Sequence, residues 1–438
     1  MHELTDLLRQ DTRPAFGVTE PGAIAFAAAA ARRRAPGPVR RIVVRLNSGM
    51  YKNAFTCGIP GSDALGPAYA AAMGAAGADP DKGLECLESV SPQQAQQADE
   101  MVKAGMVTVE LCGITSRIFI EAAVTAGTDT VTAEIRDAHT NLVKITKNGA
   151  VVWEKASGAA EGAQAPEDAP CPIHRYTLAQ LRDYALQVPI GELAFLRAAY
   201  PMNLRLLQAG LESPRSRFGP WLLAANGGEL FSRDEQATAS LLCNGAIEAR
   251  VMGLPCPAMS ITGSGAHGII AAMPLYAAYK VSGYSEESLL RATALSFLVC
   301  RYIKEYSGKL SAFCGCAIAA GTGMACGLAL LRGDDAETMA RVIGNLAGSI
   351  TGMICDGGNQ GCAMKGVVAV DAAWRAVAMA EQGAYIDNIH GIIGATPEET
   401  MRNMGRIASP GMTGTEKTIL EILQTKQGKA AKACSTPI

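Results

Sequence analysis

From about residue 176 onward, apolar residues recur every three or four positions, and this pattern constrains the fold more than any other feature. Segments such as "YTLAQLRDYALQV" (176–188) and "AETMARVIGNLAGSI" (336–350) each place their apolar side chains on one face of a helix. Alanine, glycine and small aliphatic residues dominate while aromatic residues are few, which suits closely packed helices better than a β-sandwich. We therefore predict a large all-α domain over residues 173–438.

The first part of the chain, residues 1–104, mixes helix with strand. The Ala-rich stretch "EPGAIAFAAAAARRRA" (20–35) has a proline near its first turn and arginines in its last, which is typical of a helix. The stretch "VRRIVVRLNSG" (39–49) then predicts a strand that ends in a polar turn. We expect an α/β part that contributes to the functional site.

Residues 105–172 change character, because β-branched residues alternate with polar ones up to about residue 155. The dipeptide Asn148-Gly149 is a hairpin signal. These features predict a small antiparallel β unit. The small-residue and Pro-rich stretch 156–172 then predicts a linker to the helical domain, so that the fold class is α+β.

Composition narrows the classes of function. The 438-residue chain is 49% hydrophobic and 18% charged, and its net charge of −2 without a long basic run argues against nucleic acid as a partner. The start of the chain lacks the apolar core of a signal peptide, and the apolar stretch 314–331 is so rich in glycine and cysteine that it predicts a buried helix rather than a membrane span. We expect a soluble cytoplasmic protein, not attached to a membrane, that forms a homo-oligomer such as a dimer.

The chain has thirteen cysteines. Their odd number and irregular spacing, without an export signal, argue against a disulfide framework. In a reducing compartment most would be small buried hydrophobic residues, and a subset could be thiolate ligands.

Two glycine-rich stretches combine cysteine with backbone freedom. The first, "SGKLSAFCGCAIAAGTGMACG" (307–327), contains Cys314 and Cys316, and the second, "MICDGGNQGCAMKG" (353–366), contains Cys355 and Cys362. Three thiolates from two such loops suit a metal or an iron–sulfur cluster, since glycines let the backbone approach closely. A structural zinc site fits poorly, because no C-x₂-C pair recurs. Spacing alone leaves a cluster and ordinary buried thiols both open.

Three polar stretches could line a site, although each could equally be a solvated loop or turn. A histidine or a lysine taken out of water can move protons, and hydroxyl and amide side chains can bind polar substrates. The candidates are Asn47, Ser48, Lys52 and Asn53 in "NSGMYKN", His139, Thr140 and Asn141 in "DAHTN", and Ser264 and His267 in "TGSGAHG".

Six stretches in order along the chain resemble the L-cysteine desulfidase family (UPF0597-like), a relative of the iron–sulfur L-serine dehydratases and their α chain. They are "FGVTEPGAIAFAAA", "GMYKNAFTCGIPGS", "DAHTNLV", "GSGAHGI", "SGKLSAFCGCAIAAGTG" and "GMICDGGNQGCAMK". One such stretch would be a weak signal, whereas six in the same order over nearly the whole chain are specific.

The resemblance implies a 4Fe–4S cluster held by three cysteines, with one iron open to substrate. The implied ligands are Cys355, Cys362 and either Cys314 or Cys316, with Cys314 preferred. The implied reaction is an oxygen-sensitive β-elimination from a small L-amino acid such as L-cysteine or L-serine, without pyridoxal phosphate. The implied substrate-binding and proton-transfer groups are the polar candidates above, with Lys52, His139 and His267 as possible bases.

One position departs from the family pattern. In the desulfidases a cysteine precedes "TEP", whereas here the residue is Val18, which cannot move a proton. Cys57 is a speculative replacement, with a small buried residue as the simpler interpretation. Cys434, near the C-terminus, could reach the open iron or could be a thiol of the chain end. The departure also raises the alternative of a non-catalytic or redox-sensing iron–sulfur protein on the same scaffold.

Overall fold

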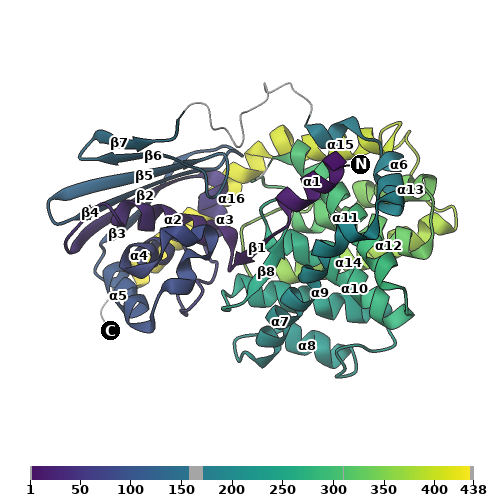
Figure 1. Ribbon diagram of the computed structural model, residues 1–438, viewed down its shortest axis with the longest axis horizontal. Helices are drawn as coiled ribbons and strands as arrows, with labels where there is room; N and C mark the ends of the chain where they lie inside the picture. The colour runs from purple at the N-terminus through teal and green to yellow at the C-terminus, as the bar shows by residue number, and fades with distance from the viewer. Residues whose placement is uncertain (1, 157–170, 309, 435–438) are drawn as a thin grey trace.

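The computed structural model describes residues 2–156, 171–308 and 310–434, and from residue 427 onward only the backbone. The described chain forms two lobes, one built on a sheet and one built from helices (Figure 1). This arrangement confirms the predicted α+β class with a large helical portion.

The N-terminal lobe is built on a six-stranded sheet with the order β3-β2-β4-β5-β6-β7. β2 pairs in parallel with β3, and the remaining neighbours are antiparallel. The helix α2 lies against β4 and β5, and α4 packs on α2. The elements of this lobe are α2 (Thr19–Arg32), β2 (Val39–Asn47), α3 (Ser48–Ala54), α4 (Pro67–Gly77), α5 (Pro92–Lys103), β3 (Val107–Gly113), β4 (Phe119–Ala126), β5 (Asp129–Arg136), β6 (Leu142–Lys147) and β7 (Ala150–Glu154).

The helical lobe has a continuous apolar core centred on α10, α11 and α12. The apolar stretch 314–331 lies inside this core as a π-helical turn, Cys316–Ala320, followed by α12, as the sequence predicts. The helices are α6 (Leu178–Gln187), α7 (Ala199–Glu212), α8 (Phe218–Ala225), α9 (Glu235–Val251), α10 (Gly265–Ser282), α11 (Glu286–Ser307), α12 (Gly321–Arg332), α13 (Ala336–Ile350), α14 (Gly361–Glu381) and α15 (Pro397–Arg406).

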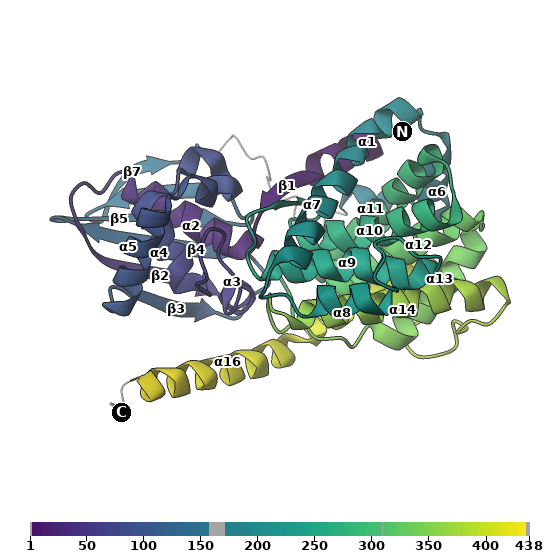
Figure 2. The ribbon, with the colours of Figure 1, turned by 90° about the horizontal axis from the view of Figure 1, so that it is seen from below.

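Each end of the chain packs on the lobe opposite to the one that its neighbouring residues build. The first helix, α1 (His2–Asp11), packs in the core of the helical lobe, and β1 (Arg13–Phe16) pairs with β8 (Pro257–Ser260). The last helix, α16 (Thr413–Cys434), leaves the helical lobe and extends beneath the N-terminal lobe, where it contacts α3 (Figure 2).

The predicted domain boundaries need two corrections. The boundary at residue 104 falls inside one structural unit, because β2 pairs with both β3 and β4 and so joins the first part of the chain to the predicted β unit. The resulting sheet is mixed rather than purely antiparallel. Residues 2–16 belong to the helical lobe, since α1 and β1 pack there. Most of the predicted linker, residues 157–170, lies outside the described residues.

No helix within the described ranges is both long and apolar enough to cross a membrane.

Candidate functional site

The two cysteine-bearing loops run side by side. An isolated antiparallel bridge joins the residues immediately before Cys314 and Cys355. The backbone N–H of Cys314 donates to the carbonyl of Met353 at 2.9 Å, and that of Cys355 donates to the carbonyl of Ala312 at 2.6 Å. These bonds place the two cysteines next to each other although 40 residues separate them in the sequence.

Glycines let the second loop lie directly on α3. Gly357 has φ +108°, and a Cβ atom there would lie 2.3 Å from the carbonyl oxygen of Lys52. A Cβ atom on Gly358 would lie 2.4 Å from Cys57 Sγ. Neither position has room for a side chain, so the glycines of "CDGG" are required by this close approach. The N–H of Gly358 donates to the carbonyl of Asn53 at 3.1 Å, which completes the contact.

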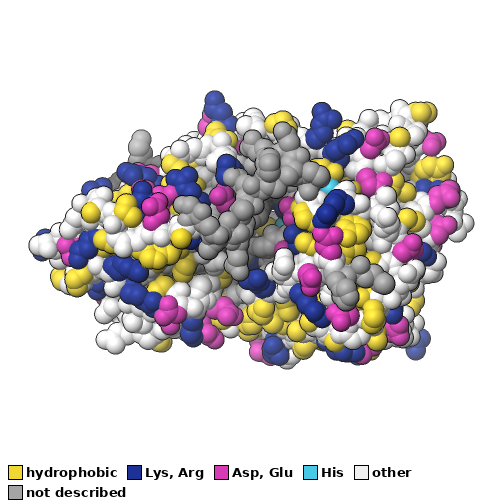
Figure 3. Space-filling model, turned by 45° about the horizontal axis from the view of Figure 1, so that its top comes forward, with side chains coloured by type: hydrophobic (Ala, Val, Ile, Leu, Met, Phe, Trp, Pro, Cys, Tyr) yellow, Lys and Arg dark blue, Asp and Glu magenta, His cyan; other side chains and the backbone are white. Residues whose placement is uncertain are grey.

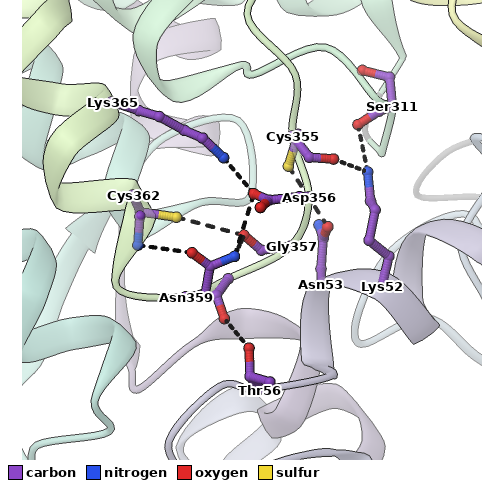
Figure 4. A network of polar contacts seen from close by, with 12 residues as sticks. Lys52, Asn53, Thr56, Ser311, Cys355, Asp356, Gly357, Asn359, Cys362 and Lys365 are labelled. Atoms are coloured by element: carbon purple, nitrogen blue, oxygen red, sulfur yellow. Dashed lines mark hydrogen bonds and ion pairs between the residues drawn. The ribbon is translucent and has the colours of Figure 1, made fainter. Parts of the chain in front are cut away.

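Lys52 joins α3 to both cysteine loops (Figure 4), and it also contacts α16. Its buried ammonium donates to the carbonyls of Ser311 and Cys355, each at 2.9 Å, and to Glu416 Oε2 at 3.0 Å. An ammonium has three donors and no acceptor, and here three acceptors surround it. This geometry favours a positioning role for Lys52 over the proton-abstracting role proposed from the sequence.

The thiols influence one another. The hydrogen bond from Cys316 lowers the pKa of Cys314, with the Lys365 ammonium acting in the same direction, and the same bond together with burial raises the pKa of Cys316. Burial raises the pKa of Cys362 to about 12. Cys314 is therefore the member of its pair that ionises first, which agrees with the preference for it over Cys316.

The CDGG loop also carries an ion pair. Lys365, one helical turn after Cys362, contacts the carboxylate of Asp356 (Figure 4). The amide of Asn359 donates to the same carboxylate at 3.3 Å. The charge of the Lys365 ammonium acts to lower the pKa of Cys314 and of Cys362.

His267 faces the CGC turn from the first turn of α10. Its Nδ1 lies 2.5 Å from Thr262 Oγ1, and that hydroxyl donates to the carbonyl of Ile261 at 2.7 Å. Because the hydroxyl proton is already engaged, Nδ1 is the donor and Nε2 keeps its lone pair. A Cβ atom on Gly315 would lie 2.8 Å from this Nε2. Burial, with the charges of Lys304 and Arg250, holds the pKa of His267 well below its usual value, so the ring is neutral.

A cavity of about 610 Å³ opens beside the site, between the two lobes. His139 and Thr140 line it from the N-terminal lobe, and Thr262, Gly263 and Lys304 line it from the helical lobe. Figure 3 shows Lys, Arg, Asp and Glu side chains spread over the visible face of both lobes. Since Thr262 holds His267, the cavity reaches the neighbourhood of the thiols.

Comparison with known proteins shows the family to which the chain belongs. A family model described as "Serine dehydratase alpha chain" matches residues 81–421. A UPF0597 protein of Clostridium botulinum is 37% identical over 425 residues, covering 96% of this chain and 98% of the relative. UPF0597 proteins of Caldanaerobacter subterraneus and Aeromonas hydrophila are 33% and 34% identical, each over 97% of this chain and over 98% and 96% of the relative.

The chain belongs to the serine dehydratase alpha chain family and is a relative of the UPF0597 proteins. The resemblance inferred from six sequence stretches is therefore confirmed at the level of this family. The names of these relatives state no substrate.

This serine dehydratase alpha-like chain brings some of the predicted residues together and leaves others apart. Asn53 reaches the thiols, with Oδ1 3.8 Å from Cys355 Sγ, while Asn47 and Ser48 are bonded to Thr115 in the turn between β3 and β4. Asn141 bonds the carbonyl of Arg136 and the Lys155 ammonium, and so stabilises the turn between β5 and β6. Ser264 precedes α10 directly.

Val18 and Cys57 both pack against Gly358. A Cβ atom on Gly358 would lie 2.4 Å from Cys57 Sγ and 3.7 Å from Val18 Cγ1, so Cys57 lies near Val18, the position that departs from the family pattern. Its thiol donates to the carbonyls of Asn53 and Gly358 at 2.8 and 3.2 Å, and burial raises its pKa well above the usual value. A protonated, bonded thiol does not act as a base. Cys434 ends α16, and its side chain lies outside the described residues.

Sequence reasoning missed two buried cations beside the thiols, Arg250 and Lys304. Each stands in a long helix, α9 or α11, in which most neighbouring residues are buried. A charged residue on the buried face of an apolar helix is the signal that could have found them, because such a charge needs a partner.

The donor set consists of cysteine thiols, which are the ligands of iron–sulfur clusters. Among the described residues no three His, Cys, Asp or Glu side chains converge closely enough to hold one metal ion. Four thiols on two paired loops, with Arg250, Lys304 and Lys365 nearby, have the chemistry that a negatively charged thiolate-bound cluster needs.

Proposed function

We propose that this chain is a 4Fe–4S-dependent lyase that removes a β-substituent, hydroxyl or thiol, from a small L-amino acid such as L-serine or L-cysteine, with release of ammonia. The observation that carries the proposal is the pairing of the CGC and CDGG loops, which brings thiols from both loops to one place beside a neutral histidine. Membership of the serine dehydratase alpha chain family supports it.

Cys314, Cys355 and Cys362 would hold the cluster, with Cys316 as the alternative to Cys314. When bound, a cluster with one open iron supplies a Lewis acid that polarises the substrate carboxylate and the leaving group. The chain supplies the remaining chemistry. Lys52 fixes the backbone of Cys355, and the backbone bond from Cys314 fixes the other loop against it.

His267 is the proposed base for the α-proton. Its Nδ1–H is held by Thr262, so Nε2 points toward the CGC turn with a lone pair available. The lowered pKa keeps the ring unprotonated at neutral pH, as a general base requires. This assignment leaves the absence of a cysteine at Val18 without consequence for proton abstraction.

The cavity between the lobes is the proposed substrate entrance. His139 and Thr140 line it on one side and Lys304 on the other, so polar groups from both lobes would meet an entering amino acid. We propose no pyridoxal phosphate, since Lys52 is fully engaged and Lys365 is paired with Asp356.

The test is anaerobic production of the protein, followed by iron and sulfide analysis and a screen of L-serine, L-cysteine and L-threonine for ammonia or sulfide release. We expect about four irons and four sulfides per chain, as a cubane requires. Cys355→Ser and Cys362→Ser should lose both the cluster absorbance and turnover. Cys243→Ser is the matched control, because that thiol is buried in α9 and belongs to neither cysteine loop. A folded protein without iron would refute the proposal.

A loaded protein that releases neither ammonia nor sulfide from any of these amino acids would instead favour the non-catalytic, redox-sensing alternative. We further propose a cytoplasmic homodimer, which light scattering of the purified protein would test.

A further inference from the structure

Arg250 is a buried cation with an unused donor. Its side chain is 4% exposed, and its Nη2 donates to Thr19 Oγ1 at 3.2 Å. Its Nε, also buried, has no hydrogen-bond partner among the described residues. A buried guanidinium N–H without a partner is costly, so it calls for a ligand that accepts a hydrogen bond.

The unused donor lies at the start of a long helix. A Cβ atom on Gly265 would lie 2.4 Å from Arg250 Nε. Gly265 is the first residue of the 18-residue α10, and the preceding Ser264 makes no side-chain cap within the described structure. The first N–H groups of a helix lack partners within the helix and carry its positive end, which suits an anion. The backbone and the guanidinium thus present donors in the same place.

This donor group faces the thiols. His267 belongs to the same first turn of α10, and its Nε2 lies 2.8 Å from where a Cβ on Gly315 would be. Gly315 separates Cys314 from Cys316 in the CGC turn. An anion that accepts from both Arg250 Nε and the first N–H groups of α10 would therefore lie next to the proposed base and the proposed cluster ligands.

An opposite charge lies near Arg250. Glu20, which follows Thr19, acts electrostatically on the guanidinium, and its Oε1 accepts from Asn53 Nδ2 at 2.9 Å. A site that presents a cation with helix N–H groups and a nearby carboxylate matches an α-amino acid zwitterion.

We propose that Arg250 and the first turn of α10 bind the carboxylate of an α-amino acid substrate, which makes Arg250 a substrate-binding residue of the site. The inference rests on the proposed function for its reaction, but its binding test does not require turnover. The sequence alone did not mark Arg250 as a candidate, because it lies in α9, outside every stretch that carried the family resemblance.

The experiment measures binding of L-alanine, which has no β-leaving group, by calorimetry on the anaerobically loaded protein and on the cluster-free protein. L-Alaninamide, which lacks the carboxylate, is the matched ligand. We expect L-alanine to bind and L-alaninamide to bind at least about tenfold more weakly, since a hydrogen bond to a charged group is lost. Arg250→Gln should weaken L-alanine binding about 10- to 100-fold, and Arg250→Lys should recover part of the loss.

Gly265→Ala is a second variant that keeps the arginine. Its Cβ would displace the guanidinium, so it should weaken L-alanine in the same way, with unchanged iron content. Arg197→Gln, which breaks only an exposed pair with Glu286, is the control and should bind as the parent does. In turnover, Arg250→Gln should raise KM far more than it lowers kcat.

Two results would overturn the proposal. Unchanged L-alanine affinity in Arg250→Gln would show that the arginine does not bind the carboxylate. A folded Arg250→Gln or Arg250→Lys protein that loses its iron would show that the arginine balances the thiolate charge instead. Failure of the proposed function gives a different pattern, namely a parent protein without iron that still distinguishes L-alanine from L-alaninamide.

Discussion

The buried ion pair between Lys52 and Glu416 joins α16 to α3, and we expect the stability of the protein to depend strongly on it. The Lys52 side chain is fully buried and that of Glu416 is 7% exposed, with 3.0 Å between Nζ and Oε2. Replacing Lys52 by Met removes the ammonium and leaves the Glu416 carboxylate buried without a partner. Breaking a buried pair from one side costs about 3–5 kcal/mol, because the remaining charge stays uncompensated.

The magnitude divides into two parts. The carbonyls of Ser311 and Cys355 each lose a donor in Lys52→Met, which costs about 1 kcal/mol apiece. The rest comes from the isolated Glu416 carboxylate, and removing that charge in Lys52→Met/Glu416→Leu should recover it. We therefore expect the double variant to be more stable than Lys52→Met alone by about 1–3 kcal/mol.

Urea unfolding of the cluster-free protein, followed by circular dichroism under reducing conditions, measures these free energies without a contribution from bound metal. Lys103→Met is the control, because Lys103 pairs with Asp99 at the surface and the pair is worth less than about 1 kcal/mol. The reasoning is refuted if Lys52→Met is no less stable than Lys103→Met, or if the two substitutions at 52 and 416 add without coupling.

Two further predictions concern packing and pH. Gly358→Ala places a Cβ 2.4 Å from Cys57 Sγ, so it should destabilise the protein by about 1–3 kcal/mol. Gly352→Ala is the control and should leave stability unchanged, because a Cβ there would meet no atom within 4 Å. Equal urea midpoints for the two variants would contradict this prediction. Burial lowers the pKa of His174, whose Nε2 lies 3.0 Å from the carbonyl of Tyr302. Because the pKa of His174 is lower in the folded chain, the unfolded chain binds a proton at this residue at higher pH than the folded chain does. The free energy of unfolding should therefore fall as pH drops through about 6.5. His174→Phe should make that fall shallower, which thermal unfolding between pH 5 and about 8 would show, and an identical slope would count against it.

Local patterns in the sequence predict the elements well. The 20–35 helix and the 39–49 strand correspond to α2 and β2, and the Asn148-Gly149 turn joins β6 to β7 with φ of 51° and 84° at the two residues. Each of these signals depends on neighbours a few positions away. Periodicity and turn chemistry therefore suffice for them.

Such local patterns could not predict contacts between segments that are distant in the sequence. Nothing in "NSGMYKN" distinguishes Asn47, which stabilises a turn in the sheet, from Lys52, whose partner Glu416 lies 364 residues later. The strand β2 enters the sheet between β3 and β4, which no local signal predicts. The family resemblance implied that cysteines from the two loops act together. The structure shows the β-bridge that holds these two loops side by side.

The candidate site draws its groups from segments that meet only in the folded chain, and this bears on the valine at position 18. Val18 and Cys57 approach the CDGG loop from the N-terminal lobe, through Gly358. His267 approaches the CGC turn from the helical lobe, through Gly315. The two approaches run through different loops, and Arg250 contacts both, through Thr19 beside Val18 and through Gly265 in the first turn of α10. Absence of a thiol from the first approach leaves His267 in place on the second, so the proposed removal of an α-proton by His267 does not need the cysteine that this chain lacks.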